Sequence, residues 1–367
     1  MIPVACARLG EEEIDAVVEV LRSGNLRQGM KCSEFEEKFK GAVGAKYATT
    51  AANGSVSLQA IYANWIGPGD EVIVPAFTFF ATAAMVCHAG GKPVFCDIDP
   101  RTFTMDVNDI EDRITRRTRA IAGVHLYGNS CDIDGILEIA VKHGLKVVWD
   151  AAQAHLTKYR GKDVGSFGDA VSYSFYATKN MTTGEGGMIA SDSPQIIENC
   201  ILMKQQGQSK KYLHTFLGTN FRMTDVEAAI GIVQLGRLAG FTEKRRENAA
   251  FLMKGLEGGD GLVMPYTEPF VEHSYHQFTV LLELEKLKIT RDEFAAKLGE
   301  AGVGTVVAYP MPLHKQPVFE KILGDQHFPN AEWVAKRCIS LPVHPYLSQE
   351  DLEKITHEVK NVIESCR

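Results

Sequence analysis

The chain has 367 residues, a length that predicts two domains because a single hydrophobic core rarely grows so large. Its composition, with 45% hydrophobic and 23% charged residues, is typical of a globular protein and excludes disorder as the main state. The formal net charge of −7 and the lack of any block of Lys and Arg argue against binding to nucleic acid or to an anionic membrane, because both need a concentrated positive field.

The eight cysteines are scattered and form no C-x-x-C pair, so we expect neither a zinc site nor a redox dithiol. The N-terminal segment turns acidic within about ten residues and lacks the charged-then-apolar order of a signal peptide. The apolar runs are far shorter than the ~20 residues of a transmembrane helix. We therefore expect a cytoplasmic protein without a bound metal ion.

Two helices are predicted before the first strand. Residues 11–24 place four apolar side chains at the i, i+3, i+4, i+7 spacing of one helix face, namely Ile14, Val17, Val18 and Leu21. Gly24 supplies the stop signal of this helix. The following residues predict a polar loop and then a second helix around Phe35 and Phe39.

Short apolar segments alternate with stretches of helical length between residues 47 and 192. The strand candidates are 70–75, 92–99, 119–128, 145–150 and 170–176, and the helix candidates include 55–66 and 132–144. Strands that are apolar throughout indicate an α/β fold, a mostly parallel sheet with helices on both faces. In such sheets ligands bind beyond the carboxyl ends of the strands. Asp150 and Lys179, which end or follow two of these strands, are therefore expected to face one crevice.

The C-terminal third has a different pattern of predicted helices and strands. Thr224 and Glu227 form the pattern of a capping box and predict a long helix from about residue 225. After Gly240 the candidate helices and strands are typical of a smaller α+β unit. We place the boundary at 240/241, within the window 238–245, which gives a large domain 1–240 and a small domain 241–367. Whether the first helix packs on the small domain stays open.

Lys179 is the first candidate for chemistry. A lysine after a strand is usually a solvated surface residue, but this one follows an apolar run, has small polar neighbours and precedes the glycine-rich segment GEGG. A lysine held in a crevice with a lowered pKa is the group that forms a Schiff base with a carbonyl cofactor. Asp150 offers the complementary group, because pyridoxal phosphate is an electron sink only while its ring nitrogen is protonated, and a buried carboxylate fixes that proton. A loop-capping role for Asp150 is the alternative.

A phosphate site is the third requirement of that cofactor. Gly54 and Ser55 stand after Asn53 at the start of a predicted helix, where free N–H groups and the helix dipole favour an anion. The same residues can also serve helix capping alone. Ser174, on the strand that leads to Lys179, offers a further hydroxyl. Of the two aromatic residues at 79 and 80, we expect one to stack on the pyridine ring and the other to lie in the core.

These residues belong to segments that resemble the DegT/StrS family of pyridoxal-phosphate-dependent sugar aminotransferases. The resemblance extends over nearly the whole chain through twelve segments in order: GEEEIDAV, EFEEKF, NGSVSLQA, PAFTFFATA, PVFCDIDP, HLYGNSCDID, DAAQAH, SFYATKN, TTGEGG, NFRMTDVEAAIG, YPMPLHKQP and LPVHPYLS. It implies the fold type I aminotransferase architecture, with a small C-terminal α+β domain, and pyridoxal 5'-phosphate as cofactor.

The resemblance also implies roles for single residues. Lys179 of SFYATKN would hold the cofactor covalently and shuttle the proton. Asp150 of DAAQAH would pair with the pyridine nitrogen, and Gln153 would lie by the phenolic oxygen. The phosphate cradle would consist of Gly54, Ser55 and Ser174, and Phe79 would be the stacking ring. Asn220 of NFRM would reach the phosphate of the neighbouring subunit, which implies a homodimer with shared active sites.

Tyr309 and His314 of YPMPLHKQP are candidates for the wall of a sugar pocket, and a structural or rim position is the alternative for His314. Two departures from the family pattern leave the chemistry intact: Ser55 stands where Thr is usual, and Trp149 where an acidic or aliphatic residue is usual. One branch of the family carries His at the aldimine-lysine position and performs dehydration. Because Lys stands at 179, the sequence predicts transamination.

The expected reaction transfers an amino group from an amino acid, by family habit L-glutamate, to a nucleotide-linked keto-sugar. A cyclitol ketone as acceptor, or a non-catalytic regulatory protein that binds the cofactor, are the alternatives. A dinucleotide-dependent Rossmann enzyme would need a G-x-G-x-x-G motif after the first strand, which the chain lacks. The ring position of the ketone and the nucleotide carrier stay open.

Overall fold

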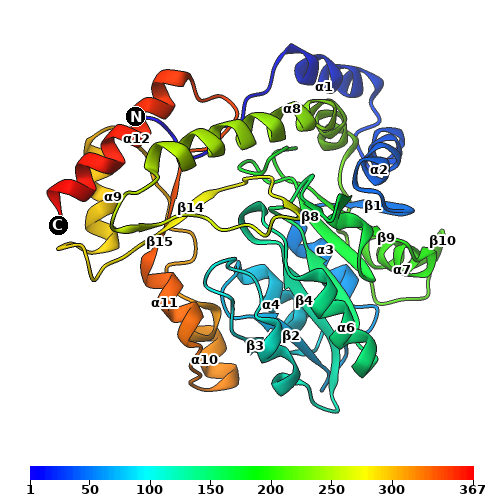
Figure 1. The fold of residues 1–367 in the computed structure, drawn as a ribbon. Helices are drawn as coiled ribbons and strands as arrows, with labels where there is room; N and C mark the ends of the chain where they lie inside the picture. The colour runs from blue at the N-terminus through cyan, green and yellow to red at the C-terminus, as the bar shows by residue number, and fades with distance from the viewer.

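A seven-stranded sheet forms the centre of the protein in the computed structural model, which describes residues 1–367 (Figure 1). Its strands follow the order β1 (Tyr47–Ala51), β9 (Gly187–Ser191), β8 (Ala170–Ser174), β5 (Lys146–Asp150), β4 (Thr118–Val124), β2 (Glu71–Pro75) and β3 (Lys92–Cys96). Only β9 runs antiparallel to its neighbours β1 and β8, and all other pairs are parallel. The predicted mostly parallel sheet is confirmed.

Helices cover both faces of this sheet. Side chains of β2 alternate between two hydrophobic clusters: Val72 and Val74 belong to one and Ile73 to the other. The first cluster is covered mainly by α3 (Gly54–Tyr62), α4 (Phe80–His88) and α7 (Pro194–Lys204), the second mainly by α2 (Met30–Val43), α5 (Val107–Ile110), α6 (Ile133–His143) and the first part of α8 (Asp225–Leu256). Both faces are thus closed to water, as a parallel sheet requires.

The C-terminal unit is built on a second, antiparallel sheet of order β12 (Leu262–Val263), β14 (Phe278–Leu282) and β15 (Cys338–Leu341). Its helices are α9 (Arg291–Glu300), α10 (Pro317–Leu323), α11 (Pro329–Arg337) and α12 (Gln349–Ser365). Two small sheets complete the fold, one of β6 (Lys158–Tyr159), β7 (Lys162–Asp163) and β13 (Val271–Glu272), the other of β10 (Gln208–Lys210) and β11 (Leu213–His214). None of the helices combines the length and the apolar composition needed to cross a membrane.

The helix α8 connects the two units without a break. It begins with the predicted capping box, in which Thr224 Oγ1 accepts from the backbone of Glu227, and it continues for 32 residues. The predicted boundary at 240/241 therefore falls inside one helix and stays a prediction. The first helix, α1 (Glu11–Ser23), packs along α8 (Figure 1). The very N-terminus joins the C-terminal unit instead, because Ile2 pairs with Val303 and packs in its core.

Trp149, one of the two departures from the family pattern, is fully buried in the second cluster. Two glycines make room for its indole: a Cβ on Gly123 would lie 2.4 Å from Trp149 Cζ3, and one on Gly168 would lie 2.6 Å from Nε1. The indole thus fits without displacing Asp150, its neighbour on β5.

Candidate active site

A cavity of about 680 Å³ lies where β5 and β8 end. All but two of the predicted site residues line it: Gly54, Ser55, Phe79, Asp150, Gln153, Ser174, Lys179 and Tyr309. They come from segments up to 255 positions apart (309 − 54 = 255). The carboxyl end of the parallel sheet thus collects these groups in one place, as expected for this class of sheet.

The carboxylate of Asp150 is buried and held by two donors. Thr82 Oγ1 donates to Oδ2 at 2.8 Å, and the backbone N–H of Ala152 donates to Oδ1 at 3.1 Å. Burial raises the pKa of Asp150, while the two hydrogen bonds and the charge of Lys179 oppose that shift. A fixed carboxylate of this kind can hold a proton on a basic ring nitrogen.

Lys179 faces the same cavity and its Nζ makes no hydrogen bond within the chain. Burial lowers the pKa of Lys179 to about 8, against the charge of Asp150, which raises it. At neutral pH a much larger share of this amine is therefore unprotonated than for an ordinary lysine, and only the unprotonated amine is a nucleophile.

The pKa of Lys179 predicts how fast the apoprotein captures a carbonyl cofactor. Below pH 8 the capture rate should rise about tenfold per pH unit, because the unprotonated fraction does, and it should level off above a midpoint of about 8. Stopped-flow absorbance with pyridoxal phosphate measures this profile. In Asp150→Asn the midpoint should move to lower pH, because the charge that raises the pKa of Lys179 is gone. A midpoint near the 10.5 of an ordinary lysine would contradict the prediction.

The N-terminus of α3 lies directly against β8. Asn53 caps the helix by accepting from the backbone N–H of Val56 at 3.0 Å, and a Cβ on Gly54 would lie 2.8 Å from Ser174 Cβ. Only glycine allows the helix end to approach the strand this closely. Free N–H groups of the helix therefore lie beside the side chain of Ser174, a suitable cradle for a phosphate group.

Gly54→Ala is expected to weaken pyridoxal phosphate binding by about tenfold, because overpacking costs about 1–3 kcal/mol and pushes the helix end away from β8. Titration of the apoprotein with the cofactor measures this change. Gly41→Ala is the matched control, since Gly41 also lies in a helix but a Cβ there meets nothing within 4 Å. Equal affinities of the two variants would contradict the role of the close approach.

Gln153 is fixed between two tyrosines. The backbone N–H of Tyr127 donates to Gln153 Oε1 at 2.7 Å, and Gln153 Nε2 donates to the Tyr309 hydroxyl at 2.8 Å. Both tyrosines have left-handed backbone conformations, with φ of 59° and 62°, which residues with a side chain adopt uncommonly. The Tyr309 hydroxyl accepts from Gln153 and so keeps its own proton for a group in the cavity.

Phe79 and Phe80 are both more than a third exposed, at 57% and 43%. The expectation that one of them lies in the core is therefore wrong. Phe79 lines the cavity with its ring 6.3 Å from that of Tyr309, whereas Phe80 packs against Phe319 at 5.4 Å. The chain turns into α4 between them, so the two rings point to different neighbours.

The two other predicted residues lie away from the cavity. Asn220 is exposed, and its side chain makes one hydrogen bond within the chain, from the backbone N–H of Arg222 to Asn220 Oδ1 at 3.5 Å. His314 is fully enclosed, with its Nε2 2.9 Å from Glu332 Oε1 and its ring against Phe328. The structural position that the sequence left as an alternative for His314 is the one observed.

Two of the side chains that sequence reasoning missed bear directly on the chemistry of the site. Thr82, which holds Asp150, stands one helical turn after Phe79, and a lone hydroxyl in an apolar helix was its only signal. His276 lines the cavity from the segment before β14, and no motif marks it.

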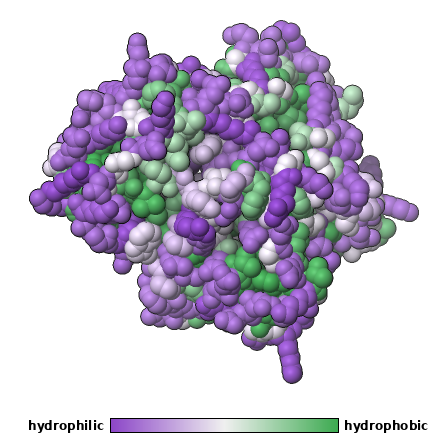
Figure 2. Space-filling view, viewed as in Figure 1, coloured by the Kyte–Doolittle hydropathy of each residue, from purple (hydrophilic) through white to green (hydrophobic).

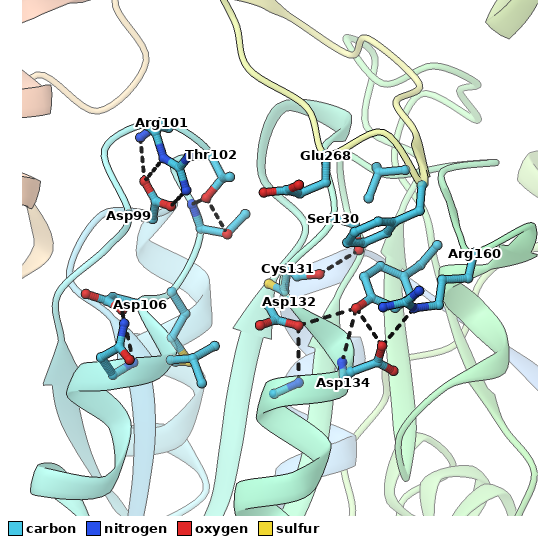
Figure 3. Close-up of a pocket in the computed structure, with 18 of the residues that line it drawn as sticks. Asp99, Arg101, Thr102, Asp106, Ser130, Cys131, Asp132, Asp134, Arg160 and Glu268 are labelled. Carbon is cyan, nitrogen blue, oxygen red and sulfur yellow. Dashed lines mark hydrogen bonds and ion pairs between the residues drawn. The ribbon is translucent and has the colours of Figure 1, made fainter.

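A second cavity of about 490 Å³ lies between the loop after β3 and the start of α6 (Figure 3). Six carboxylates line it against two guanidinium groups: Asp99, Asp106, Asp132, Asp134, Glu138 and Glu268, with Arg101 and Arg160. Arg101 pairs with Asp99 and Arg160 with Asp134. The cavity contains no lysine or histidine, and its negative charge disfavours a phosphate group, so the cavity with Lys179 is the candidate active site.

Residues 7–360 match the DegT/DnrJ/EryC1/StrS aminotransferase family. The chain belongs to this family. A relative named pleiotropic regulatory protein from Geobacillus stearothermophilus is 41% identical over 96% of the chain and 94% of its own length. GDP-perosamine synthase of Caulobacter vibrioides is 36% identical over 99% of the chain and 98% of its own length.

Among solved structures, a protein of Streptococcus pneumoniae described as a sugar aminotransferase superposes in its PLP form with a TM-score of 0.92, at 29% identity and 99% coverage of both chains. The fold type I architecture predicted from the sequence is thereby confirmed. The cavity also fits the cofactor: a buried carboxylate, an amine of lowered pKa and a helix N-terminus lie together in it. The protein is an aminotransferase with pyridoxal phosphate as its cofactor.

Proposed function

We propose that this aminotransferase moves an amino group from an amino acid, with L-glutamate as the first candidate, to a nucleotide-linked keto-sugar. The placement of Lys179 and Asp150 in one cavity carries the proposal, because the two side chains supply both the movable proton and the fixed counter-charge that amino transfer needs. The relative named for GDP-perosamine, a nucleotide-linked amino sugar, supports the substrate class.

Residues from several sides of the cavity would take part in this reaction. When bound, pyridoxal phosphate supplies the electron sink for the breaking C–H bond. The carboxylate of Asp150 would keep the proton on the ring nitrogen, and Lys179 Nζ would hold the cofactor covalently and then carry the transferred proton. The start of α3 with Ser174 would bind the phosphate. Phe79 would cover one face of the ring, and Gln153 with Tyr309 would lie at its edge.

The proposal is tested in two half-reactions. The holoprotein is first mixed with L-glutamate, and the absorbance of the bound cofactor should change as the cofactor takes up the amino group. The aminated protein is then offered a panel of nucleotide-linked 3-keto and 4-keto sugars and a cyclitol ketone. Return of the original absorbance with one nucleotide sugar supports the proposal. If the original absorbance returns only with the cyclitol ketone, the acceptor is a cyclitol ketone and not a nucleotide sugar. If the absorbance does not change with any amino donor, a regulatory role is favoured, as in the name of the Geobacillus relative.

We further propose that two chains share their active sites as a homodimer. The nucleoside diphosphate of the acceptor and the carboxylate of the amino donor are both anionic, but no arginine lines the cavity. The positive charges that would bind these groups therefore have to come from outside the cavity. The segment 208–219, which contains β10 and β11, exposes the apolar side chains of Tyr212, Leu213, Phe216 and Leu217, the last at 95%. It projects beside α7 in Figure 1, and Figure 2 shows hydrophobic patches within a mainly hydrophilic surface. Apolar side chains that are exposed together in one segment, as in 208–219, favour a protein partner.

Asn220 follows this segment and would reach the phosphate site of the second subunit. Asn220→Ala is expected to weaken cofactor binding about 10–100-fold, the effect of losing a hydrogen bond to a charged group. The decisive control mixes Asn220→Ala subunits with Lys179→Ala subunits. If Asn220 acts across the interface, the mixed dimer contains one complete site and regains activity at cofactor concentrations too low to fill the sites of the Asn220→Ala homodimer. If dimers that are shown to contain one subunit of each variant do not recover activity, the proposal of a shared site is contradicted. A cytoplasmic location stays a prediction from the sequence.

A further inference from the structure

His276 is the one titratable side chain of the cavity wall that the proposed reaction does not use and that the structure holds in a fixed orientation. It is 8% exposed and lies just before β14, in the same cavity as Lys179. His88 also lines this cavity, but no hydrogen bond fixes its ring.

The backbone around His276 is fixed at three points. The N–H of Ser274 donates to the carbonyl of Gly128 at 3.0 Å, and the N–H of Gln277 donates to the carbonyl of Tyr127 at 3.1 Å. Arg245, a buried residue of α8, donates to the carbonyl of His276 at 3.3 Å. Gly128 has φ +97° and could not carry a Cβ, which would lie 2.9 Å from the His276 nitrogen. The ring is thus presented by a rigid frame.

The hydrogen bonds of Asn180 determine which ring nitrogen carries the proton. Asn180 Nδ2 donates to the carbonyl of Ser274 at 3.2 Å, and a carbonyl can only accept, so the amide orientation is settled. Asn180 Oδ1 then faces His276 Nδ1 at 3.2 Å, and Nδ1 must be the donor. In the neutral ring Nε2 is therefore the acceptor.

The ring also stays neutral. Burial lowers the pKa of His276 well below 6.5, and the charges of Lys179 and Arg245 lower it further. Nε2 has no partner within the chain and is not enclosed by it, so its lone pair opens into the cavity that His276 lines. A lone pair repels the carboxylate of an amino donor and binds a hydroxyl, which has a proton to donate.

We propose that His276 is a specificity-determining residue whose Nε2 accepts a hydrogen bond from the sugar hydroxyl next to the keto carbon. The proposal rests on the proposed function, since it concerns the sugar that Lys179 acts on. The neighbouring hydroxyl is singled out because His276 Nδ1 lies 3.2 Å from the side chain of Asn180, the residue directly after Lys179, and His276 and Lys179 line the same cavity. A site built to accept from a hydroxyl discriminates against the analogue that lacks it, because the buried acceptor is then left unpaired.

The test compares two acceptors in the nucleotide carrier that the panel selects: a keto-sugar with a hydroxyl next to the ketone, and the same sugar with that hydroxyl replaced by hydrogen. The wild type should prefer the first by at least about tenfold in kcat/KM. His276→Phe should remove most of this preference. His276→Gln should retain part of it, because the amide oxygen can take the place of Nε2. Cofactor absorbance and melting temperature show whether each variant is folded. If His276→Phe does not fold, His276→Leu takes its place.

Equal kcat/KM of the wild type for both sugars would overturn the proposal without any variant. An unchanged preference in folded His276→Phe or His276→Leu would overturn it as well. Both results leave the proposed function standing, because transfer to a nucleotide sugar is still observed. Absence of transfer to every nucleotide sugar would instead overturn the proposed function and, with it, this role of His276.

Discussion

Lys179→Ala is expected to lower the rate constant of amino transfer by at least 10²–10⁴-fold, roughly the contribution of general acid–base catalysis alone. The variant loses the only amine in the cavity wall, and with it both the covalent attachment of the cofactor and the proton carrier. Single-turnover absorbance after mixing the holoprotein with L-glutamate measures the rate. The cofactor should still bind through its phosphate, because the cradle at α3 and Ser174 is unchanged.

The control for this variant is Lys286→Ala. Lys286 is an exposed lysine of the C-terminal unit that pairs with Asp260 and Glu283 at 2.8 and 2.9 Å. Its removal should leave the rate within the range of ordinary surface substitutions. A near-normal rate of amino transfer by purified Lys179→Ala would contradict the catalytic role assigned to Lys179.

Asp150→Asn is expected to reduce turnover about 10–100-fold. The change removes the negative charge that would hold the proton on the cofactor ring, and a hydrogen bond to a charged group is worth about 1.5–3 kcal/mol. The fold should survive, because the amide oxygen of asparagine can accept from the N–H of Ala152 while its NH2 group donates to the hydroxyl of Thr82, which can also accept. Steady-state kcat together with the cofactor dissociation constant separates a loss of chemistry from a loss of binding.

Asp163→Asn provides the matched control for this second variant. Asp163 is also an enclosed carboxylate whose pKa burial raises, to about 7, and it accepts from the N–H of Gly165, but it lies outside the cavity. Its replacement can change stability and should leave kcat unaffected. Equal losses of kcat in the two variants would show that the effect of Asp150→Asn is structural and not chemical.

Much of the site was accessible from the sequence because its groups stand at strand ends and helix starts. The alternation of apolar strands and helices places Asp150 and Ser174 at the carboxyl edge of the sheet, and the Asn-Gly-Ser helix start marks the cradle. His314 shows the limit of such reasoning: its motif suggested a pocket wall, but Glu332 and Phe328 enclose it from other elements. A side chain in a loop can turn toward either side, and only its packing decides.

The boundary between the two units shows the same limit. A change in texture near residue 240 is visible in the sequence, yet α8 continues through it, because its first half packs on α1 and α2 and its second half on α12. Helix propensity alone does not distinguish one long helix from two short ones, since tertiary contacts supply most of the stability of a helix.

The sequence by itself determined the α/β fold, the family and the cofactor, because local patterns and a dense series of motifs carry this information. It also predicted that Lys179 and Asp150 share one site, and both line the same cavity. The tertiary structure alone decided that Thr82 holds Asp150, that Tyr309 pairs with Gln153, and that Asn180 pairs with His276. These contacts join residues 68, 156 and 96 positions apart. Contacts over such separations depend on how the elements pack, which no local pattern of residues specifies.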